Sequence, residues 1–249
     1  MYTYRREIRT PHSIEVEIYK SIRKVGKYYG GRNANSGKSG AKQKEANRIR
    51  AAAKYERLID CNFCENDYFC RFSAPYGTFT DEESFMREVN NWFRRIKRRC
   101  EARGLVFKYI GFRECGKSGK NWHLHIILSE EVSRIARECW HWQNGGINLA
   151  PLWQNHEYKK LAEYIHKDVS GSKRMMTSRN LTKPDVVVKK ATRREIRMLE
   201  RGELLPAPEG YMMIEDELSV RISEVTGAAW YFKYKPVCCR STKKQNRRS

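Results

Sequence analysis

The stretch Trp122-His123-Leu124-His125-Ile126-Ile127-Leu128 decides the fold, because it is a strongly patterned strand with two histidines in an apolar run. Side chains alternate between the two faces of a strand, so His123 and His125 share one face. Trp122, Leu124, Ile126 and Leu128 take the other face, which we expect to pack into a core. The histidine face either offers two imidazoles to a metal ion or is simply the solvated side of an amphipathic strand.

A second predicted strand lies upstream, at residues 106–114, and the glycine-bearing stretch 115–120 separates it from the first. If the two strands form a hairpin with its turn at Ser118-Gly119, Glu114 lies opposite His123 on the same face. A shift of one residue would turn Glu114 to the packed face. The pattern therefore predicts a metal site made by Glu114, His123 and His125. This open set of ligands suits Mg²⁺ or Mn²⁺ better than a closed structural zinc site.

Residues 111–118 also match the phosphate-loop pattern G-x-x-x-x-G-K-S. That pattern binds phosphates only where a helix begins at the Lys-Ser pair, because the helix N-terminus supplies the amides. Here another glycine and then a strand follow. We therefore interpret the match as a coincidence within a hairpin turn and predict no ATPase module.

A helix is predicted downstream, at residues 157–168, where Tyr158, Leu161 and Ile165 recur at helical spacing and form a buried stripe. Tyr164 and Lys167 are three residues apart and share a face beside that stripe. A tyrosine can attack phosphorus when a cation or metal ion stabilises the phenolate and polarises the phosphoryl group. Alone, the pair is equally well a packed tyrosine beside a solvated lysine. Combined with the upstream hairpin, it indicates a nucleophile.

The His-hydrophobe-His strand, the preceding carboxylate and the Tyr-x-x-Lys at 164–167 together resemble the single-tyrosine HUH endonucleases. Within that group the resemblance is specifically to the rolling-circle replication initiators of plasmids, phages and mobile elements. It covers roughly residues 55–190, and residues 178–184 also resemble a stretch found after the tyrosine helix. Residues 67–74 stand where a first motif is expected. Relatives usually carry hydroxyl residues there, whereas this chain has Cys70, Arg71 and Ser73.

The resemblance implies that the protein nicks and rejoins single-stranded DNA at a replication origin. Tyr164 would form a 5′-phosphotyrosine and release a 3′-hydroxyl for a host polymerase, while a metal ion held by the three ligands polarises the phosphate. Lys167 would help to neutralise charge. The chain contains no recognisable helicase, so a host helicase is an expected partner. A transposase or mobilisation relaxase would use the same residues, and a non-enzymatic RNA-binding module is the alternative from another class.

The charge balance supports a nucleic-acid partner, because 50 Lys+Arg against 29 Asp+Glu give a formal net charge of +21. The excess is distributed along the whole chain. Each basic run is either a solvated helix face or a DNA contact. The candidate DNA-binding residues are Arg94, Arg95, Arg98, Lys189, Lys190, Arg193 and Arg194.

The order of patterned segments predicts an α+β fold, with an antiparallel sheet of about five strands and helices packed on one face. The resemblance implies a ferredoxin-like arrangement. Residues 1–58 are predicted as a basic N-terminal arm with a strand at 10–19 and a helix at 42–58. Residues 59–190 would form the endonuclease domain, with its last strand at 186–188, and residues 191–249 a basic C-terminal extension.

The eight cysteines favour a reducing cytoplasm, because no apolar signal segment precedes them and no stretch is long enough to span a membrane. Cys61 and Cys64 have half the spacing of a zinc site, but no matching second pair follows. Free thiols are therefore favoured over zinc at this pair. The sequence does not define the oligomeric state.

Overall fold

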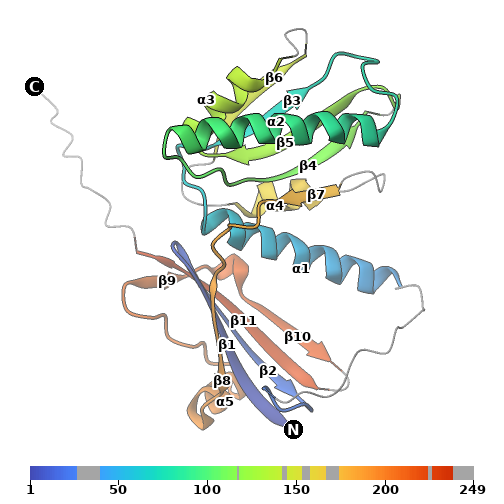
Figure 1. The fold of residues 1–249 in the computed structure, drawn as a ribbon. Coiled ribbons are helices and arrows are strands. Elements are labelled where there is room, and N and C mark those ends of the chain that lie inside the picture. The colour runs from blue at the N-terminus through green and yellow to red at the C-terminus, as the bar shows by residue number, and fades with distance from the viewer. Residues whose placement is uncertain are drawn as a thin grey trace, which may run out of the picture. The chain divides into compact units, whose positions relative to one another are not determined.

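A computed structural model describes residues 1–26, 40–116, 118–141, 145–152, 158–166, 174–223 and 226–237. The chain forms two compact units, each with its own sheet (Figure 1). Unit 1 combines Met1–Asn35 with Pro184–Ser249, and unit 2 is the continuous segment Ser36–Lys183. These boundaries differ from the predicted divisions at residues 58 and 190.

Unit 2 contains a five-stranded antiparallel sheet in the order β6-β3-β5-β4-β7. Its strands are β3 (Tyr68–Ser73), β4 (Ile110–Cys115), β5 (Trp122–Leu128), β6 (Ile147–Pro151) and β7 (Arg174–Thr177). The prediction of an α+β fold built on a five-stranded antiparallel sheet is confirmed.

Two helices, α2 (Glu82–Ala102) and α3 (Glu130–Cys139), cover one face of this sheet. Helix α2 begins after Asp81, whose side chain accepts a hydrogen bond from the backbone N–H of Ser84. Its buried stripe packs against the apolar face of β3 and β5. The stripe consists of Phe85, Val89, Trp92, Ile96 and Cys100.

The other face of the sheet packs against α1 (Ala41–Asp60) and α4 (Lys159–His166). Alanine and long charged side chains dominate α1, in keeping with their high helix propensity. The shared cluster includes Ile59 of α1, Leu161 of α4 and Phe112 of β4. Helices therefore lie on both faces of the sheet rather than on one, and α4 lies on the same face as the two histidines.

Unit 1 contains a second antiparallel sheet in the order β10-β11-β2-β1-β8, with β9 paired to β11. Its elements are β1 (Tyr2–Thr10), β2 (Ser13–Ser21), β8 (Asp185–Lys190), α5 (Arg193–Glu200), β9 (Tyr211–Met213), a 3₁₀ turn (Glu215–Glu217), β10 (Ser219–Ser223) and β11 (Gly227–Pro236). The N-terminal segment thus supplies a hairpin to a sheet, where the sequence predicted one strand in an arm. The assignment of residues 186–188 to the endonuclease sheet was wrong, because β8 pairs with β1.

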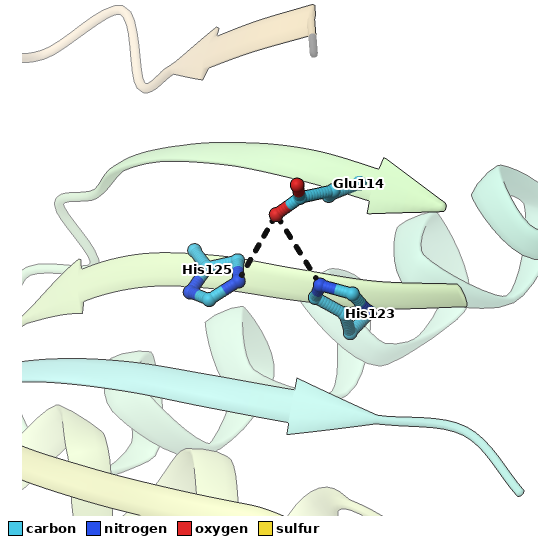
Figure 2. Close-up of side chains that lie close together, drawn as sticks. All are labelled: Glu114, His123 and His125. Carbon is cyan, nitrogen blue, oxygen red and sulfur yellow. Dashed lines mark hydrogen bonds and ion pairs between the residues drawn. The ribbon is translucent and has the colours of Figure 1, made fainter. Parts of the chain in front are cut away.

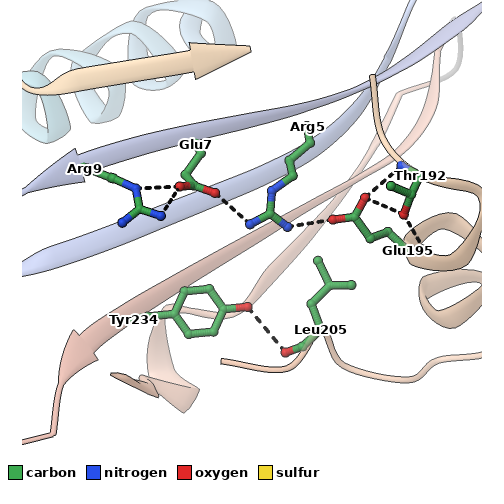
Figure 3. Close-up of polar contacts among 7 residues, drawn as sticks. All are labelled: Arg5, Glu7, Arg9, Thr192, Glu195, Leu205 and Tyr234. Atoms are coloured by element: carbon green, nitrogen blue, oxygen red, sulfur yellow. Dashed lines mark hydrogen bonds and ion pairs between the residues drawn. The ribbon is translucent and has the colours of Figure 1, made fainter. Parts of the chain in front are cut away.

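A polar network connects β1 with the start of α5 in unit 1 (Figure 3). Arg5 contacts Glu195 at 2.7 Å and Glu7 at 2.8 Å, and Arg9 contacts Glu7 at 2.6 Å. Glu195 and Thr192 also form a reciprocal capping box at the N-terminus of α5. Burial alone would raise the pKa of Glu7, but the hydrogen bonds from Arg5 and Arg9 outweigh it and lower that pKa.

None of the helices in the described ranges is long and apolar enough to cross a membrane.

Candidate active site

Glu114, His123 and His125 converge on the face of the unit 2 sheet that carries α4 (Figure 2). Glu114 and His123 are direct partners in the β4–β5 pair, so the predicted hairpin register is confirmed. Oε2 of Glu114 lies 3.3 Å from Nε2 of His123 and 3.6 Å from Nε2 of His125. The three ligand atoms lie within 4.8 Å of one another, which is close enough to share one ion.

The hairpin turn and one buried glycine set this register. The N–H of Gly116 donates to the carbonyl of Asn121, and Gly119 takes a positive φ of 72°, which glycine adopts without strain. In β4, a Cβ added at Gly111 would lie 2.4 Å from the carbonyl oxygen of His125. Strand β5 follows the G-x-x-x-x-G-K-S match, and no helix begins there among the described residues. The interpretation of that match as a coincidence therefore agrees with the fold.

Both imidazoles are buried, and neighbouring groups hold each of them in place. Nδ1 of His123 lies 3.2 Å from the backbone carbonyl of Asn121, which leaves Nε2 facing Glu114. The ring of His125 stacks on Phe112, with ring centroids 4.6 Å apart, and on Phe69 at 5.6 Å. Both rings are therefore oriented before any ligand arrives.

The electrostatics of the triad favour metal binding. Burial lowers the pKa of His123 and the charge of Arg71 lowers it further, while Glu114 acts in the opposite direction. The neutral imidazole is the form that coordinates a metal ion. Within the described residues, this is the one group of three His, Cys, Asp or Glu side chains close enough to hold an ion, and Cys61 and Cys64 are not part of such a group. The donor set therefore fits a divalent cation.

Tyr164 lies beside the triad on α4. Its ring centroid is 6.3 Å from that of His125 and 6.2 Å from that of Phe69, and its side chain is 45% exposed. The predicted stripe of Tyr158, Leu161 and Ile165 is buried, which turns Tyr164 to the margin of the helix. Burial raises the pKa of Tyr164, Glu114 raises it further, and Arg71 opposes them. Lys167 lies outside the described residues.

An open hollow runs from Tyr164 toward the end of β6, with a volume of about 1420 Å³. Aromatic and apolar side chains form much of its wall, including Tyr68 and Phe69 of β3, while Lys160 of α4 contributes a positive charge. The phenol of Tyr164 therefore borders space large enough for an extended substrate.

The structure also places a basic residue at the site that the sequence analysis did not assign. Arg71 of β3 is the direct partner of His125 on β5, so the two side chains share a face of the sheet. The signal was present in the sequence, because Arg71 is one of the residues that depart from the family's first motif. Its register opposite His125 would have placed it there.

The predicted DNA-binding residues are not gathered at the triad. Arg94, Arg95 and Arg98 line a separate hollow together with Glu138. This hollow lies on α2, which covers the sheet face opposite the triad. In unit 1, Lys189 and Lys190 are at the end of β8, and Arg193 and Arg194 begin α5.

A family model of replication-associated proteins of the ORF2 type matches residues 77–170, which is less than half of the chain. The matched range includes the three triad residues, Tyr164 and Lys167. It therefore covers both parts of the candidate site, and the similarity is consistent with a rolling-circle replication initiator. No curated protein and no solved structure matches the chain.

Proposed function

We propose that this protein is a rolling-circle replication initiator that nicks and rejoins single-stranded DNA at an origin, in the manner of single-tyrosine HUH endonucleases. The position of Tyr164 beside the Glu114, His123 and His125 triad carries the proposal, with ring centroids of Tyr164 and His125 6.3 Å apart. The match of residues 77–170 to a replication-associated family supports it independently.

In the proposed reaction, the phenolic oxygen of Tyr164 attacks the scissile phosphorus and the 3′-oxygen leaves. Because the pKa of Tyr164 is raised by burial and by Glu114, the phenol carries its proton at neutral pH and needs a compensating positive charge to react. Mg²⁺ or Mn²⁺ held by Glu114, His123 and His125 would supply that charge and polarise a phosphoryl oxygen. Lys167, three residues after Tyr164, is proposed to neutralise the phosphate or the phenolate.

The basic surfaces are proposed to hold DNA away from the reacting phosphate. The arginines at 94, 95 and 98 are separated from the triad by the sheet, so they would bind a different part of the origin from the strand that is cut. Lys189, Lys190, Arg193 and Arg194 form a further basic group in unit 1. Such contacts to phosphates make binding strongly dependent on salt concentration. A host helicase and polymerase are the proposed protein partners.

A transposase or a mobilisation relaxase would use the same residues on different DNA. Preferential nicking at a replication origin, rather than at a transposon end or a transfer origin, distinguishes the initiator from these. A binding module without catalysis would give no reason for a tyrosine to lie beside a buried triad of metal ligands.

The test is an adduct assay with single-stranded DNA carrying a label at its 3′ end, because the 3′ fragment stays on the tyrosine. The full chain is incubated with Mn²⁺ and a random-sequence pool of oligonucleotides, and the products are separated under denaturing conditions. We expect wild type and Tyr158→Phe to carry the label and Tyr164→Phe to carry none. Labelling of Tyr164→Phe, or its loss only in Tyr158→Phe, would contradict the assignment of the nucleophile.

A second variant tests the metal ligands separately from DNA binding. Replacing both His123 and His125 with alanine should remove cation-dependent nicking and retain most salt-sensitive DNA affinity, since that affinity comes from dispersed basic side chains. Fluorescence anisotropy on an uncut oligonucleotide measures the affinity. Loss of both properties together would indicate a structural role for the histidines.

A further inference from the structure

Arg71 lies in the middle of the unit 2 sheet, on the face that carries the triad. It pairs with His125 on one side and with Asn148 of β6 on the other. Directly opposite residues of an antiparallel pair point to the same face, so the side chain of Arg71 leaves the sheet beside the imidazole of His125. The effects of Arg71 on the pKa values of His123 and Tyr164 place its charge within electrostatic range of both.

The guanidinium of Arg71 is available for a ligand. Its side chain is exposed, and among the described residues it forms no hydrogen bond or ion pair. Arg113 on β4 provides a contrast, because it points to the other face of the sheet and its guanidinium is bound by Glu82. Arg71 instead opens onto a hollow whose other polar walls are Ser73, Asn121 and Asn148.

An unpaired arginine at this position is chemically suited to a phosphate. The guanidinium fork can donate two parallel hydrogen bonds to the non-bridging oxygens of a phosphodiester. A donor fixed in place where charge develops is also the arrangement that stabilises a phosphoryl-transfer transition state. The site would then hold the phosphate from one side by Arg71 while Tyr164 approaches from α4.

We propose that Arg71 is a catalytic residue that binds a non-bridging oxygen of the phosphodiester attacked by Tyr164. This inference rests on the proposed nicking function. In the step concerned, the bond from phosphorus to the Tyr164 oxygen forms and the bond to the 3′-oxygen breaks. The phenol loses its proton and the 3′-oxygen gains one, while the guanidinium keeps its protons and its charge throughout.

The test compares wild type, Arg71→Ala, Arg71→Lys and the control Arg87→Ala. Arg87 is an exposed arginine of α2 that forms an ion pair with Glu83, and it belongs to no proposed site. The substrate is an oligonucleotide cut by wild type, prepared once with a normal phosphodiester and once with a neutral methylphosphonate at the mapped scissile position. The rate of adduct formation is measured for each pair.

On the normal substrate, Arg71→Ala should react about 10²–10³-fold more slowly than wild type, as for loss of one transition-state donor. Arg71→Lys should recover part of that rate, because it keeps the charge and loses the fork. On the methylphosphonate, Arg71→Ala and wild type should react at similar rates, since the charge that Arg71 stabilises is gone. Arg87→Ala should match wild type on both substrates.

Two results would overturn the inference while the proposed function stands. One is an Arg71→Ala variant that matches wild type on the normal substrate, and the other is an equal defect on both substrates, which marks a purely structural role. Absence of any adduct with wild type, or its persistence in Tyr164→Phe, would instead refute the nicking function itself.

Discussion

Glu114 and His123 face each other across the β4–β5 pair, with Oε2 of the carboxylate 3.3 Å from Nε2 of the imidazole. Their pairing depends on the register of one hairpin, because a slip of a single residue would place them on opposite faces of the sheet. The features that fix the hairpin therefore fix the candidate metal site as well.

Removing the carboxylate should weaken metal binding directly. Glu114→Gln keeps the size and polarity of the side chain and removes its negative charge, so we expect the affinity for Mn²⁺ to fall by at least about tenfold. Titration calorimetry of the full chain measures this. Glu83→Gln serves as the control, since Glu83 is an exposed carboxylate of α2. Equal affinities for wild type and Glu114→Gln would argue against the triad as the site.

Adding a methyl group at Gly111 should damage both stability and the site. The new Cβ would meet the carbonyl oxygen of His125 at 2.4 Å, so β4 and β5 must move apart. We expect Gly111→Ala to lower the free energy of unfolding by about 1–3 kcal/mol, as overpacking does, and to weaken Mn²⁺ binding. Urea unfolding checks the first effect. Gly40→Ala is the control, because a Cβ there meets no atom within 4 Å.

The cysteines of unit 2 should differ widely in reactivity. Cys70 is fully buried, and burial raises its pKa to about 12, so its thiolate is scarce at neutral pH. Cys64 is exposed. We expect iodoacetamide to modify Cys64 within minutes and Cys70 only after unfolding in urea, as measured by peptide mass spectrometry. Rapid modification of native Cys70 would mean that the β3 core opens readily.

Unit 1 should lose stability in acid through its polar network. Burial opposes the lowering of the pKa of Glu195, but hydrogen bonds from Thr192 and Arg5 outweigh it, and Glu7 behaves similarly. Groups with a lowered folded pKa stabilise the fold above their unfolded pKa of about 4.3, and this contribution is lost as the pH falls through the folded value.

The measurement is hydrogen exchange of the β1 amides at pH 7 and pH 3.5, corrected for the intrinsic exchange rate. Wild type should lose protection between these two pH values. Glu7→Gln removes one of the two titrating groups, so its protection should fall less over the same interval. The same pH dependence in both proteins would exclude Glu7 as a source of acid sensitivity.

The unit 2 site could be predicted largely from local sequence, because its main parts are close together along the chain. The β4–β5 hairpin spans one short turn, so alternation and turn residues defined both strands and their register. The stripe of Tyr158, Leu161 and Ile165 likewise defined the orientation of α4, which is buried on that side. The candidate ligands and the tyrosine follow from these two local patterns.

The remaining features depend on pairings between distant segments, which alternation within one segment does not specify. Strand β1 pairs with β8 and β2 pairs with β11, so unit 1 joins residues from both ends of the sequence. The position of Arg71 likewise required the register between β3 and β5, two strands that are far apart in sequence. A basic residue in a patterned strand could not be assigned to a site without that partner.

The connectivity of unit 1 has a consequence for synthesis on the ribosome. Unit 2 is one continuous segment and can fold as soon as residue 183 has emerged, whereas the sheet of unit 1 needs β11, which ends at Pro236. The hairpin of β1 and β2 is made first and must wait for most of translation with unpaired strand edges. A nascent chain arrested before β11 would expose the apolar face of Ile14, Val16 and Ile18, which makes it a natural client for chaperones.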